Sequence, residues 1–288
     1  MTLDNFGQQD RTLLGRRYSL TVSKTAPFGV YLNAQNLGDV LLPTKFVPTK
    51  TAVGDVIDVF LYLDSEDRPV ATTQRPKAII GQFAYLEAVA NTDVGTFLDW
   101  GLDKDILVPF SEQHRPMQVA NSYLVYLYLN DADGRIVASS KIDKFLDDDA
   151  PHNFTPTQAV QLIIANSTEL GFKAIVDHSH WGVLYRNEVH QRLSFGQSIQ
   201  GFVRRVRADG KIDLSLQGGQ ETRDKHTQLI LNYLNEQDGF APVHDKSDPQ
   251  LISRLFGMSK GAFKKSIGGL YKRGVIDIEK EGIRLRKA

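Results

Sequence analysis

The sequence predicts a mainly β protein in which three small barrels in tandem precede a small α+β domain. Two observations predict this fold class. Three stretches repeat one pattern of short strands and turns, and the apolar positions change to a helical period after residue 222. A chain of 288 residues is also long enough for about two to four compact domains.

The repeat is visible in the spacing of small residues. A glycine follows the second expected strand of each stretch, at Gly29, Gly95 and Gly171. Twenty-five residues later a small residue opens a fourth strand, at Gly54, Ala120 and Gly196. Each stretch closes with a hairpin turn, DSEDR, DADGR or RADGK. Three sets held to the residue indicate an internal repeat rather than chance.

Each repeat has about five short strands with alternating apolar positions, which predicts a small closed barrel. Five strands in roughly 65 residues suit the OB-fold, whose strand 2–3 face carries oligonucleotides in many members. The Asp- and Pro-containing segment FLDDDAPHNFTP predicts an interdomain linker. The expected ranges are 1–76 and 77–146 for the first two barrels, 147–156 for the linker, 157–219 for the third barrel and 222–288 for the last domain.

The last domain has the element order of a winged helix-turn-helix. One face of the segment KHTQLILNYLNEQ collects Ile230, Tyr233 and Leu234. The second and third helices have cap signals: Ser247 or Asp248 before one and Ser259 before the other, with stops at Gly257 and Gly274. The segment VIDIEKEGIRLR then predicts a hairpin with a turn at Glu281-Gly282. Helix, helix, turn, helix and hairpin is the winged-helix order.

Charge is unevenly distributed along a chain whose formal net charge is zero. Lys and Arg minus Asp and Glu is +1 for residues 1–77, −7 for 78–150, +2 for 151–220 and +4 for 221–288. A neutral total therefore does not exclude a nucleic-acid partner, because a local basic patch is what attracts phosphates.

Several function classes are disfavoured by the composition. The chain has no cysteine, which excludes disulfides and Cys-ligated metals and fits a reducing cytoplasm. The N-terminus lacks the apolar segment of a signal peptide, and the longest apolar run, YLVYLYL, is too short to span a bilayer as a helix. We expect a cytoplasmic protein with no membrane partner.

No enzyme signature emerges from the motifs. The sequence has neither a P-loop nor a dinucleotide-binding glycine pattern. The pair His178 and His180, together with His190, is a weak metal signal because no cluster of acidic ligands accompanies it. We expect these histidines to be loop residues, and we expect no catalysis, no metal and no cofactor.

The repeats resemble a known domain family. The glycine before an aromatic second strand, the LLP-like third strand, the GD-V-V segment and the D-x-x-G/D-R turn resemble the S1 RNA-binding domain. Three such units, the third carrying LGFKAIVD, WGVLYRNEV and RADGKIDLSLQ, followed by a winged helix, resemble the conserved virulence factor B family of bacterial RNA-binding regulators. The resemblance covers essentially the whole chain. It implies RNA binding and pleiotropic control of gene expression without catalysis.

The resemblance also implies site residues. S1 domains place two aromatics on strand 2, an aromatic or His at the end of strand 3, and an Asp and an Arg at the last hairpin turn. The first unit matches best, with Phe28, Tyr31, Asp64 and Arg68, and Lys24 adds a cation. The second keeps Phe97, Asp131 and Arg135 but has Val94 at the other aromatic position. Pro43 and Pro109 stand where the His is common.

Exposed rings with cations nearby suit RNA, because a base stacked on an aromatic face gains about 1–3 kcal/mol. The alternative is that Phe28 and Tyr31 belong to the barrel core, as most strand aromatics do. The S1 pattern favours the binding role for both rings.

In the third unit Leu170 and Lys173 stand at the aromatic positions, Tyr185 ends strand 3, and Arg207 and Lys211 replace the Asp and Arg. A three-residue loop at 208–210 with Gly210 left-handed predicts the register of the hairpin FVRRVRADGKIDLSL. The expected pairs are Phe202 with Leu216, Arg204 with Leu214, Arg205 with Asp213, Val206 with Ile212, and Arg207 with Lys211.

This register gives Arg205 a carboxylate partner and leaves Arg207 and Lys211 as two unpaired cations, a candidate phosphate site. The same loop geometry places Asp64 opposite Arg68 and Asp131 opposite Arg135 in the earlier units.

The third helix of the winged domain is the other basic candidate. Phe263, Ile267 and Leu270 share its inward face. The basic residues on or beside this helix are Lys260, Lys264, Lys265, Lys272 and Arg273. They suit a phosphate backbone, although an ordinary solvated face is the alternative. In the wing, Glu279 is expected opposite Arg284 and Asp277 opposite Arg286, which neutralises both arginines and predicts weak duplex-DNA binding at best.

The leading hypothesis is a non-catalytic RNA-binding protein for single-stranded RNA. The first alternative is a DNA-binding transcription regulator acting through the winged helix. The second is a scaffold associated with the ribosome or polymerase, in which the barrels bind protein.

Overall fold

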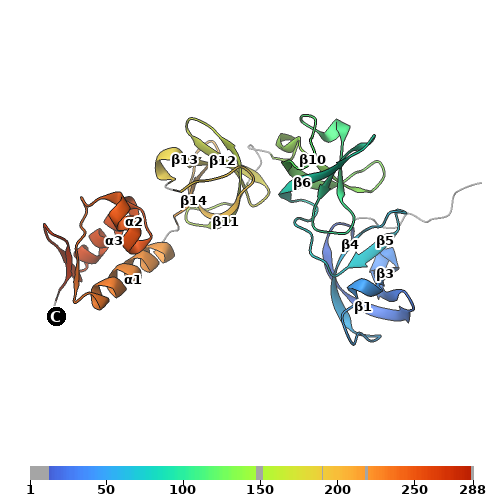
Figure 1. Cartoon of the computed structure of the whole chain (residues 1–288), viewed down its shortest axis with the longest axis horizontal. Coiled ribbons are helices and arrows are strands. Elements are labelled where there is room, and N and C mark those ends of the chain that lie inside the picture. The colour runs from blue at the N-terminus through green and yellow to red at the C-terminus, as the bar shows by residue number, and fades with distance from the viewer. Residues whose placement is uncertain (1–12, 147–151, 190, 218–219, 287–288) are drawn as a thin grey trace, which may run out of the picture. The chain divides into compact units, whose positions relative to one another are not determined.

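The structure, a computed structural model, describes residues 13–146, 152–189, 191–217 and 220–286. Within these residues the chain forms three closed five-stranded barrels and a smaller α+β domain (Figure 1). The predicted mainly β fold class, with three barrels before a winged-helix-like domain, is confirmed.

The three barrels share one strand order. The first contains β1 (Arg17–Ala26), β2 (Gly29–Asn33), β3 (Asp39–Pro43), β4 (Val56–Leu63) and β5 (Pro69–Thr72). The second contains β6 (Phe83–Asn91), β7 (Gly95–Asp99), β8 (Ile106–Pro109), β9 (Ser122–Leu129) and β10 (Ile136–Ser139). The third contains β11 (Ala159–Ser167), β12 (Gly171–Val176), β13 (His180–Tyr185), β14 (Ser198–Val206) and β15 (Ile212–Ser215). In each barrel the third and fifth strands run parallel, as β3 and β5 do.

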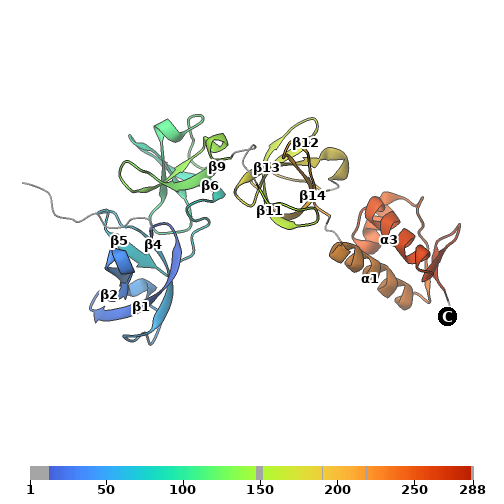
Figure 2. The same ribbon diagram turned by 180° about the vertical axis from the view of Figure 1, so that it is seen from behind.

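Closure brings the first and fourth strands of each barrel together. In the third barrel β11 pairs antiparallel with β14, and Figure 2 shows these two strands side by side. A short 3-10 turn follows the third strand of each barrel: η3 (Thr44–Phe46), η4 (Phe110–Glu112) and η6 (Arg186–Glu188). Two further 3-10 turns are η2 (Gln35–Leu37) and η5 (Ile142–Phe145).

The repeated glycine begins the second strand and does not follow it as predicted, and its position has a steric cause. A Cβ on Gly29 would lie 2.1 Å from the carbonyl oxygen of Leu42. A Cβ on Gly95 would lie 2.3 Å from the carbonyl oxygen of Val108, and a Cβ on Gly171 would lie 2.0 Å from that of Leu184. The second strand therefore approaches the third more closely than any side chain permits.

Strand β4 shows how one strand serves two cores. Its alternate residues Ile57, Val59, Leu61 and Leu63 fill the first barrel. The residues between them point outward, yet Phe60 is fully buried, because it joins the apolar cluster of the second barrel. Its ring lies edge-on to Trp100, with the ring centres 5.6 Å apart.

Polar contacts reinforce this junction between the first two barrels. The Nζ of Lys104 donates to the carbonyl oxygens of Asp64 at 2.7 Å and Leu63 at 3.2 Å. Arg135 of the second barrel forms an ion pair with Asp67 of the first. The two barrels therefore belong to one compact unit.

The last domain contains α1 (Gln220–Glu236), β16 (Phe240–Ala241), α2 (Pro249–Phe256), α3 (Lys260–Lys272), β17 (Ile276–Ile278) and β18 (Ile283–Leu285). Its three strands form a sheet in the order β16-β18-β17. The predicted inward faces are confirmed, because Ile230, Leu234, Phe263, Ile267 and Leu270 are all buried in one core.

The predicted helix caps are also present. Asp248 caps α2 by accepting hydrogen bonds from two backbone N–H groups, and Gly257 ends that helix in the left-handed conformation. Ser259 caps α3 by accepting from the N–H of Ala262 at 3.2 Å. These local signals explain why the helices begin and end at these residues.

The predicted register of the wing is wrong by one step. Asp277 lies opposite Arg284, and the N–H of Glu279 donates to the carbonyl of Gly282, so the turn is Lys280-Glu281. The predicted ion pairs nevertheless form diagonally, Arg284 with Glu279 at 3.0 Å and Arg286 with Asp277 at 2.7 Å. Long arginine side chains reach the diagonal neighbour on the same face of a strand pair.

Candidate nucleic-acid interface

The first barrel presents two aromatic rings and a lysine together. Phe28 lies in the β1–β2 turn and is 56% exposed. Its ring meets that of Tyr31 edge-on, with the centres 6.2 Å apart. Lys24, opposite Tyr31 in the strand pairing, places its Nζ 4.4 Å from the centre of the Tyr31 ring and 3.4 Å from the carboxylate of Asp39. Neither ring belongs to the buried core of this barrel, as far as the described residues show.

The hairpin turn of the first barrel contains the predicted Asp64–Arg68 pair. The backbone N–H of Asp64 donates to the carbonyl of Arg68 at 3.0 Å, and the side chains form an ion pair at 2.8 Å. Burial by itself raises the pKa of Asp64. The hydrogen bonds from Arg68 and from the N–H of Glu66 outweigh burial and hold the pKa below its usual value. Arg68 also pairs with Glu66 at 2.8 Å, so two carboxylates share its charge.

In the second barrel the predicted pairing of Asp131 with Arg135 is wrong. The N–H of Asn130, not of Asp131, donates to the carbonyl of Arg135 at 2.8 Å, because the turn contains one more residue than in the first barrel. The side chain of Arg135 pairs with Asp67 across the junction. Phe97 is half-buried on β7, so this barrel keeps one ring and directs its arginine to the first barrel.

The third-barrel hairpin follows the predicted register only near its turn. Arg205 lies opposite Asp213 and Val206 opposite Ile212, and Gly210 has a φ of 80°. Farther from the turn the prediction is wrong, because Arg204 forms a β-bulge. Val203 then lies opposite Leu214, and Phe202 lies opposite Ser215.

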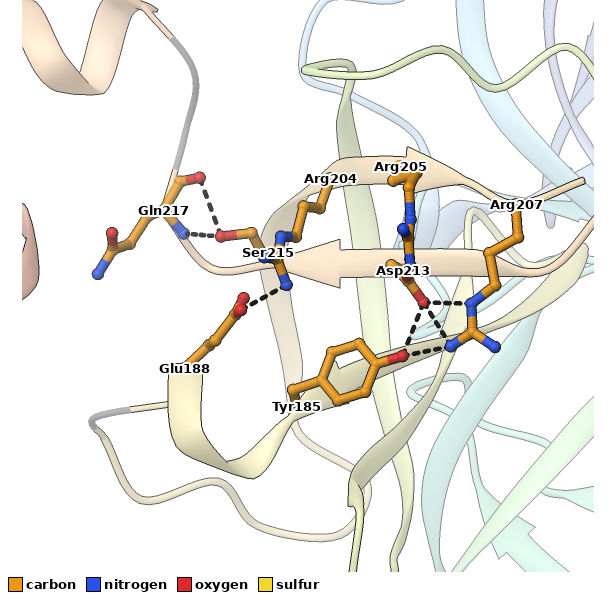
Figure 3. A network of polar contacts seen from close by, with 8 residues as sticks. All are labelled: Tyr185, Glu188, Arg204, Arg205, Arg207, Asp213, Ser215 and Gln217. Atoms are coloured by element: carbon orange, nitrogen blue, oxygen red, sulfur yellow. Dashed lines mark hydrogen bonds and ion pairs between the residues drawn. The ribbon is translucent and has the colours of Figure 1, made fainter.

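The bulge resolves the unfavourable position predicted for Arg204. Released from the ladder, its side chain forms an ion pair with Glu188 of η6 (Figure 3). These two residues, with Tyr185, Asn187 and Arg205, line a surface pocket of about 470 Å³.

Asp213 is the centre of a buried polar cluster (Figure 3). Its side chain is 2% exposed. One carboxylate oxygen accepts from Arg207 Nε at 2.8 Å and from the Tyr185 hydroxyl at 3.1 Å. The other accepts from Arg205 Nη2 at 2.7 Å and Nε at 3.1 Å. Arg207 also donates to the Tyr185 hydroxyl.

The prediction that Arg207 and Lys211 are unpaired is therefore wrong. Arg207 is bound to Asp213, and Lys211 lies 3.5 Å from Asp209. The backbone of Arg207 does donate to the carbonyl of Lys211, as the register required. What the pattern missed is that Asp213 is shared by two arginines.

The electrostatics of Asp213 follow from this arrangement. Burial by itself raises the pKa of its carboxyl group. The hydrogen bonds from Arg207, Arg205 and Tyr185 outweigh burial, so the pKa lies below the ordinary value. The carboxylate in turn raises the pKa of Arg207. The cluster therefore stays ionised, with two positive charges and one negative.

The sister barrels carry valine where the third carries Asp213. In each barrel the third strand pairs in parallel with the fifth. Leu41 pairs with Val70 in the first barrel and Leu107 with Val137 in the second, whereas Val183 pairs with Asp213 in the third. The sequence spacing also contained a sign of the bulge. Arg207 is the eleventh residue after Gly196, whereas Asp64, at the equivalent place in the first barrel, is the tenth residue after Gly54. The extra residue is the bulged Arg204.

Two cation–aromatic pairs in the third barrel were also missed. The Nζ of Lys173 lies 3.8 Å from the centre of the Trp181 ring, and the guanidinium of Arg186 lies 5.4 Å from that of Phe172. No repeat position predicted them, because the first two barrels have other residue types there.

Lys264, Lys265 and Lys272 of α3 are exposed, as are Arg273 directly after the helix and the ring of Tyr271, which is 49% exposed. Lys260 is half-buried, and its Nζ donates to the carbonyl of Lys246 at 3.2 Å. The exposed basic face that the sequence placed opposite Phe263 is therefore present on this helix.

No group of three or more metal-ligating side chains occurs in the described part of the chain, and His190 lies outside it. The helices that the structure describes include none long and apolar enough to cross a membrane.

Two domain family models match this chain, one in its N-terminal part and one in its C-terminal part. Residues 14–74 match the S1 domain, and residues 228–285 match the CvfB-like winged helix domain. A conserved virulence factor B from Staphylococcus aureus is 29% identical over 252 residues, which are 82% of this chain and 81% of that protein. This chain is a homologue of conserved virulence factor B. The resemblance predicted from the sequence is confirmed.

Other relatives cover still more of the chain. The uncharacterized protein YitL of Bacillus subtilis is 28% identical over 275 residues, 91% of this chain and 90% of that protein. A crystal structure of a multidomain protein with nucleic acid binding domains from Streptococcus pneumoniae is 25% identical and covers 96% of this chain and 99% of that chain, with a TM-score of 0.40. The two matched family models are an S1 domain and a winged helix domain, neither of which is an enzyme family.

Proposed function

We propose that this protein is a non-catalytic RNA-binding protein that binds single-stranded RNA on its barrels and acts in post-transcriptional or pleiotropic control of gene expression. The observation that carries the proposal is the Phe28, Tyr31 and Lys24 group on an S1 domain. Its regulatory part rests on the relationship to conserved virulence factor B.

The physical case concerns an apolar ring left in water. Phe28 is 56% exposed, although burying an aromatic ring is one of the larger gains available to a small barrel. An unpaired base stacked on such a ring gains about 1–3 kcal/mol whatever its sequence. Lys24, on the adjoining strand, supplies a cation for the phosphate that follows that base.

Fluorescence anisotropy over a salt series tests the proposal. The probes are a labelled single-stranded RNA of about 24 nucleotides, since one OB barrel covers about 4–16, and a duplex DNA of the same length. We expect the RNA to bind more tightly at every salt concentration, with an affinity that falls as salt rises. Tighter binding of the duplex throughout would overturn the proposal. Binding of neither probe would favour a scaffold that binds ribosomal or polymerase proteins.

A second candidate function, duplex-DNA binding, is favoured by the exposed Lys264, Lys265 and Lys272 of α3 and by Arg273 directly after it. The wing weakens this candidate, because Arg284 and Arg286 are paired with acidic residues of the same hairpin. Replacing Lys265 and Lys272 by Gln and repeating the duplex titration tests it. An unchanged duplex affinity would exclude α3 as a DNA-reading helix.

A further inference from the structure

Two arginines of the third barrel share one buried carboxylate. Arg205 and Arg207 both bind Asp213, at 2.7 Å each for the closest ion-pair distance. The cluster keeps a net charge of +1, because the hydroxyl of Tyr185 contributes none. The side chain of Asp213 is 2% exposed, whereas Arg205 is 65% exposed and Arg207 is 30% exposed. An anion in solution therefore meets the guanidinium groups and not the carboxylate.

Both arginines keep unused donors. Asp213 and Tyr185 occupy the Nε and Nη2 groups, and the Nη1 group of each arginine makes no hydrogen bond to any residue that the structure describes. In Figure 3 the third guanidinium nitrogen of Arg207 points away from Asp213 and Tyr185. Paired N–H donors on guanidinium groups suit the oxygens of a phosphate.

Asp213 has two possible effects on such a site. As a negative charge it weakens the attraction of the arginines for phosphate. As an acceptor of hydrogen bonds from both arginines it fixes both side chains, so that less freedom is lost when a phosphate binds. The second effect is the larger one here, because the carboxylate lies behind the arginines and both guanidinium groups are already oriented. Without it, two like charges on neighbouring outward positions would repel each other and separate.

The arrangement is specific to the third barrel. The equivalent residues of the other barrels are Val70 and Val137. Where the fourth strand of each barrel pairs with the fifth, β14 carries a bulge and β4 and β9 do not. In the corresponding turn of the first barrel, Asp64 occupies the place that Arg207 has in the third, and it pairs with Arg68. That turn therefore has one arginine beside a carboxylate and no pair of arginines.

We infer that Asp213 is a positioning residue that holds Arg205 and Arg207 as a two-arginine site for a backbone phosphate of RNA. The inference rests on the proposed function. It goes beyond it by assigning the third barrel a phosphate site, and by assigning an acidic residue a favourable role in binding a polyanion.

The test compares two neutralising substitutions in one hairpin, in the full chain. Asp213→Asn and Asp209→Asn change the net charge by the same amount. Asp209 is 52% exposed and pairs with Lys211, outside the cluster. We expect Asp213→Asn to weaken binding of the labelled single-stranded RNA by about tenfold, which corresponds to about 1.4 kcal/mol. Asp209→Asn should leave the affinity unchanged or raise it, because only repulsion is removed.

Asp213→Val is the second variant, since it installs the residue of the sister barrels. We expect it to weaken RNA binding at least as much as Asp213→Asn, although it makes the protein more positive. The dependence of log Kd on log salt should also become shallower by about 0.7 for each phosphate that the variant no longer neutralises. Circular dichroism melting identifies a variant that fails to fold, in which case the Asn variant decides.

The outcomes separate the two proposals. If the wild type binds RNA and Asp213→Asn binds as tightly or more tightly, Asp213 only neutralises the arginines and this inference is overturned. The proposed function then still stands. If the wild-type protein binds no RNA, both fail.

Discussion

Phe28 and Tyr31 sit at the same edge of the first barrel, yet they are covered to different degrees. Phe28 is 56% exposed, and Tyr31 is half-buried under the Lys24 ammonium group. Exposure separates the two roles open to a strand aromatic, because a core ring stabilises the fold and an exposed ring is available to a ligand. Single-residue variants can therefore distinguish binding from packing.

We expect the double substitution Phe28→Ala and Tyr31→Ala to weaken single-stranded RNA binding by roughly tenfold or more, since removing the stacking of each base costs about 1–3 kcal/mol. The first barrel should stay folded, because Phe28 is exposed and the half-buried Tyr31 lies outside the buried core cluster. Anisotropy and thermal melting measure the two effects. Phe110→Ala is the matched control, a ring 57% exposed in the acidic second barrel, and it should leave RNA affinity unchanged. Loss of cooperative melting in the double variant would assign the rings to the core.

The buried carboxylate of Asp213 makes a pH-dependent contribution to stability. Its folded-state pKa is below the ordinary value, so its ionised form stabilises the folded state. This contribution is fully present above the unfolded pKa of about 3.9 and is lost as the pH falls through the folded value. We expect wild type and Asp213→Asn to differ in unfolding free energy at pH 6, and we expect this difference to shrink as the pH falls below about 4. Urea unfolding at several pH values measures this, and a difference that stays constant with pH would contradict it.

At the scale of elements, the β14–β15 hairpin differs from its counterparts by a single residue. The bulge at Arg204 lets Val203 and Val206 both face the core although three positions separate them. In β4 the equivalent core residues, Leu61 and Leu63, alternate without interruption. The register of a strand pair is set by such core positions.

Deleting Arg204 should therefore be tolerated. Val203 and Val206 would then alternate normally and Arg205 would remain opposite Asp213. The cost is chiefly the partly exposed Arg204–Glu188 ion pair, about 0–1 kcal/mol, so the melting temperature should fall by no more than about 4 °C. Deleting Val203 instead would place Arg204 on the core face and should abolish cooperative melting. Equal effects of the two deletions, measured by calorimetry, would disprove this account of the bulge.

At the scale of the whole molecule, the first two barrels are one unit because the outer face of β4 is apolar. Phe60 reaches the core cluster of the second barrel and leaves the core of the first untouched. Replacing Phe60 therefore tests whether the first two barrels unfold as one unit.

We expect Phe60→Ala to cost about 3–5 kcal/mol, the usual range for truncating a buried phenylalanine. It should split the unfolding of the first two barrels into separate transitions in calorimetry. Val59→Ala, inside the first barrel, should lower stability without separating them. A single shared transition in the Phe60 variant would show that other interactions, such as Lys104 with the Asp64 carbonyl, suffice for the coupling.

Much of this architecture could be predicted because its signals are local. The glycine spacing reflects a backbone contact between neighbouring strands, the helix ends at Asp248, Gly257 and Ser259 reflect caps, and alternation reflects the barrel walls. The aromatic group of the first barrel was predictable for the same reason, because Lys24, Phe28 and Tyr31 lie on one two-stranded segment.

The partners of the arginines were not predictable in this way. Arg135 pairs with Asp67 of another barrel, Arg204 reaches η6, and Arg207 shares Asp213 with a tyrosine from β13. The first two pairings join segments that are distant in sequence. Arg207 and Asp213 are only six residues apart, but Arg207 reaches Asp213 diagonally rather than from the position opposite it. One bulged residue also changes which side chains lie opposite in this hairpin. The sequence by itself determined the three barrels, the winged domain and their strand patterns. Only the tertiary structure decided which cations are already paired and which keep donors for a ligand, because charge pairing depends on distances across the fold.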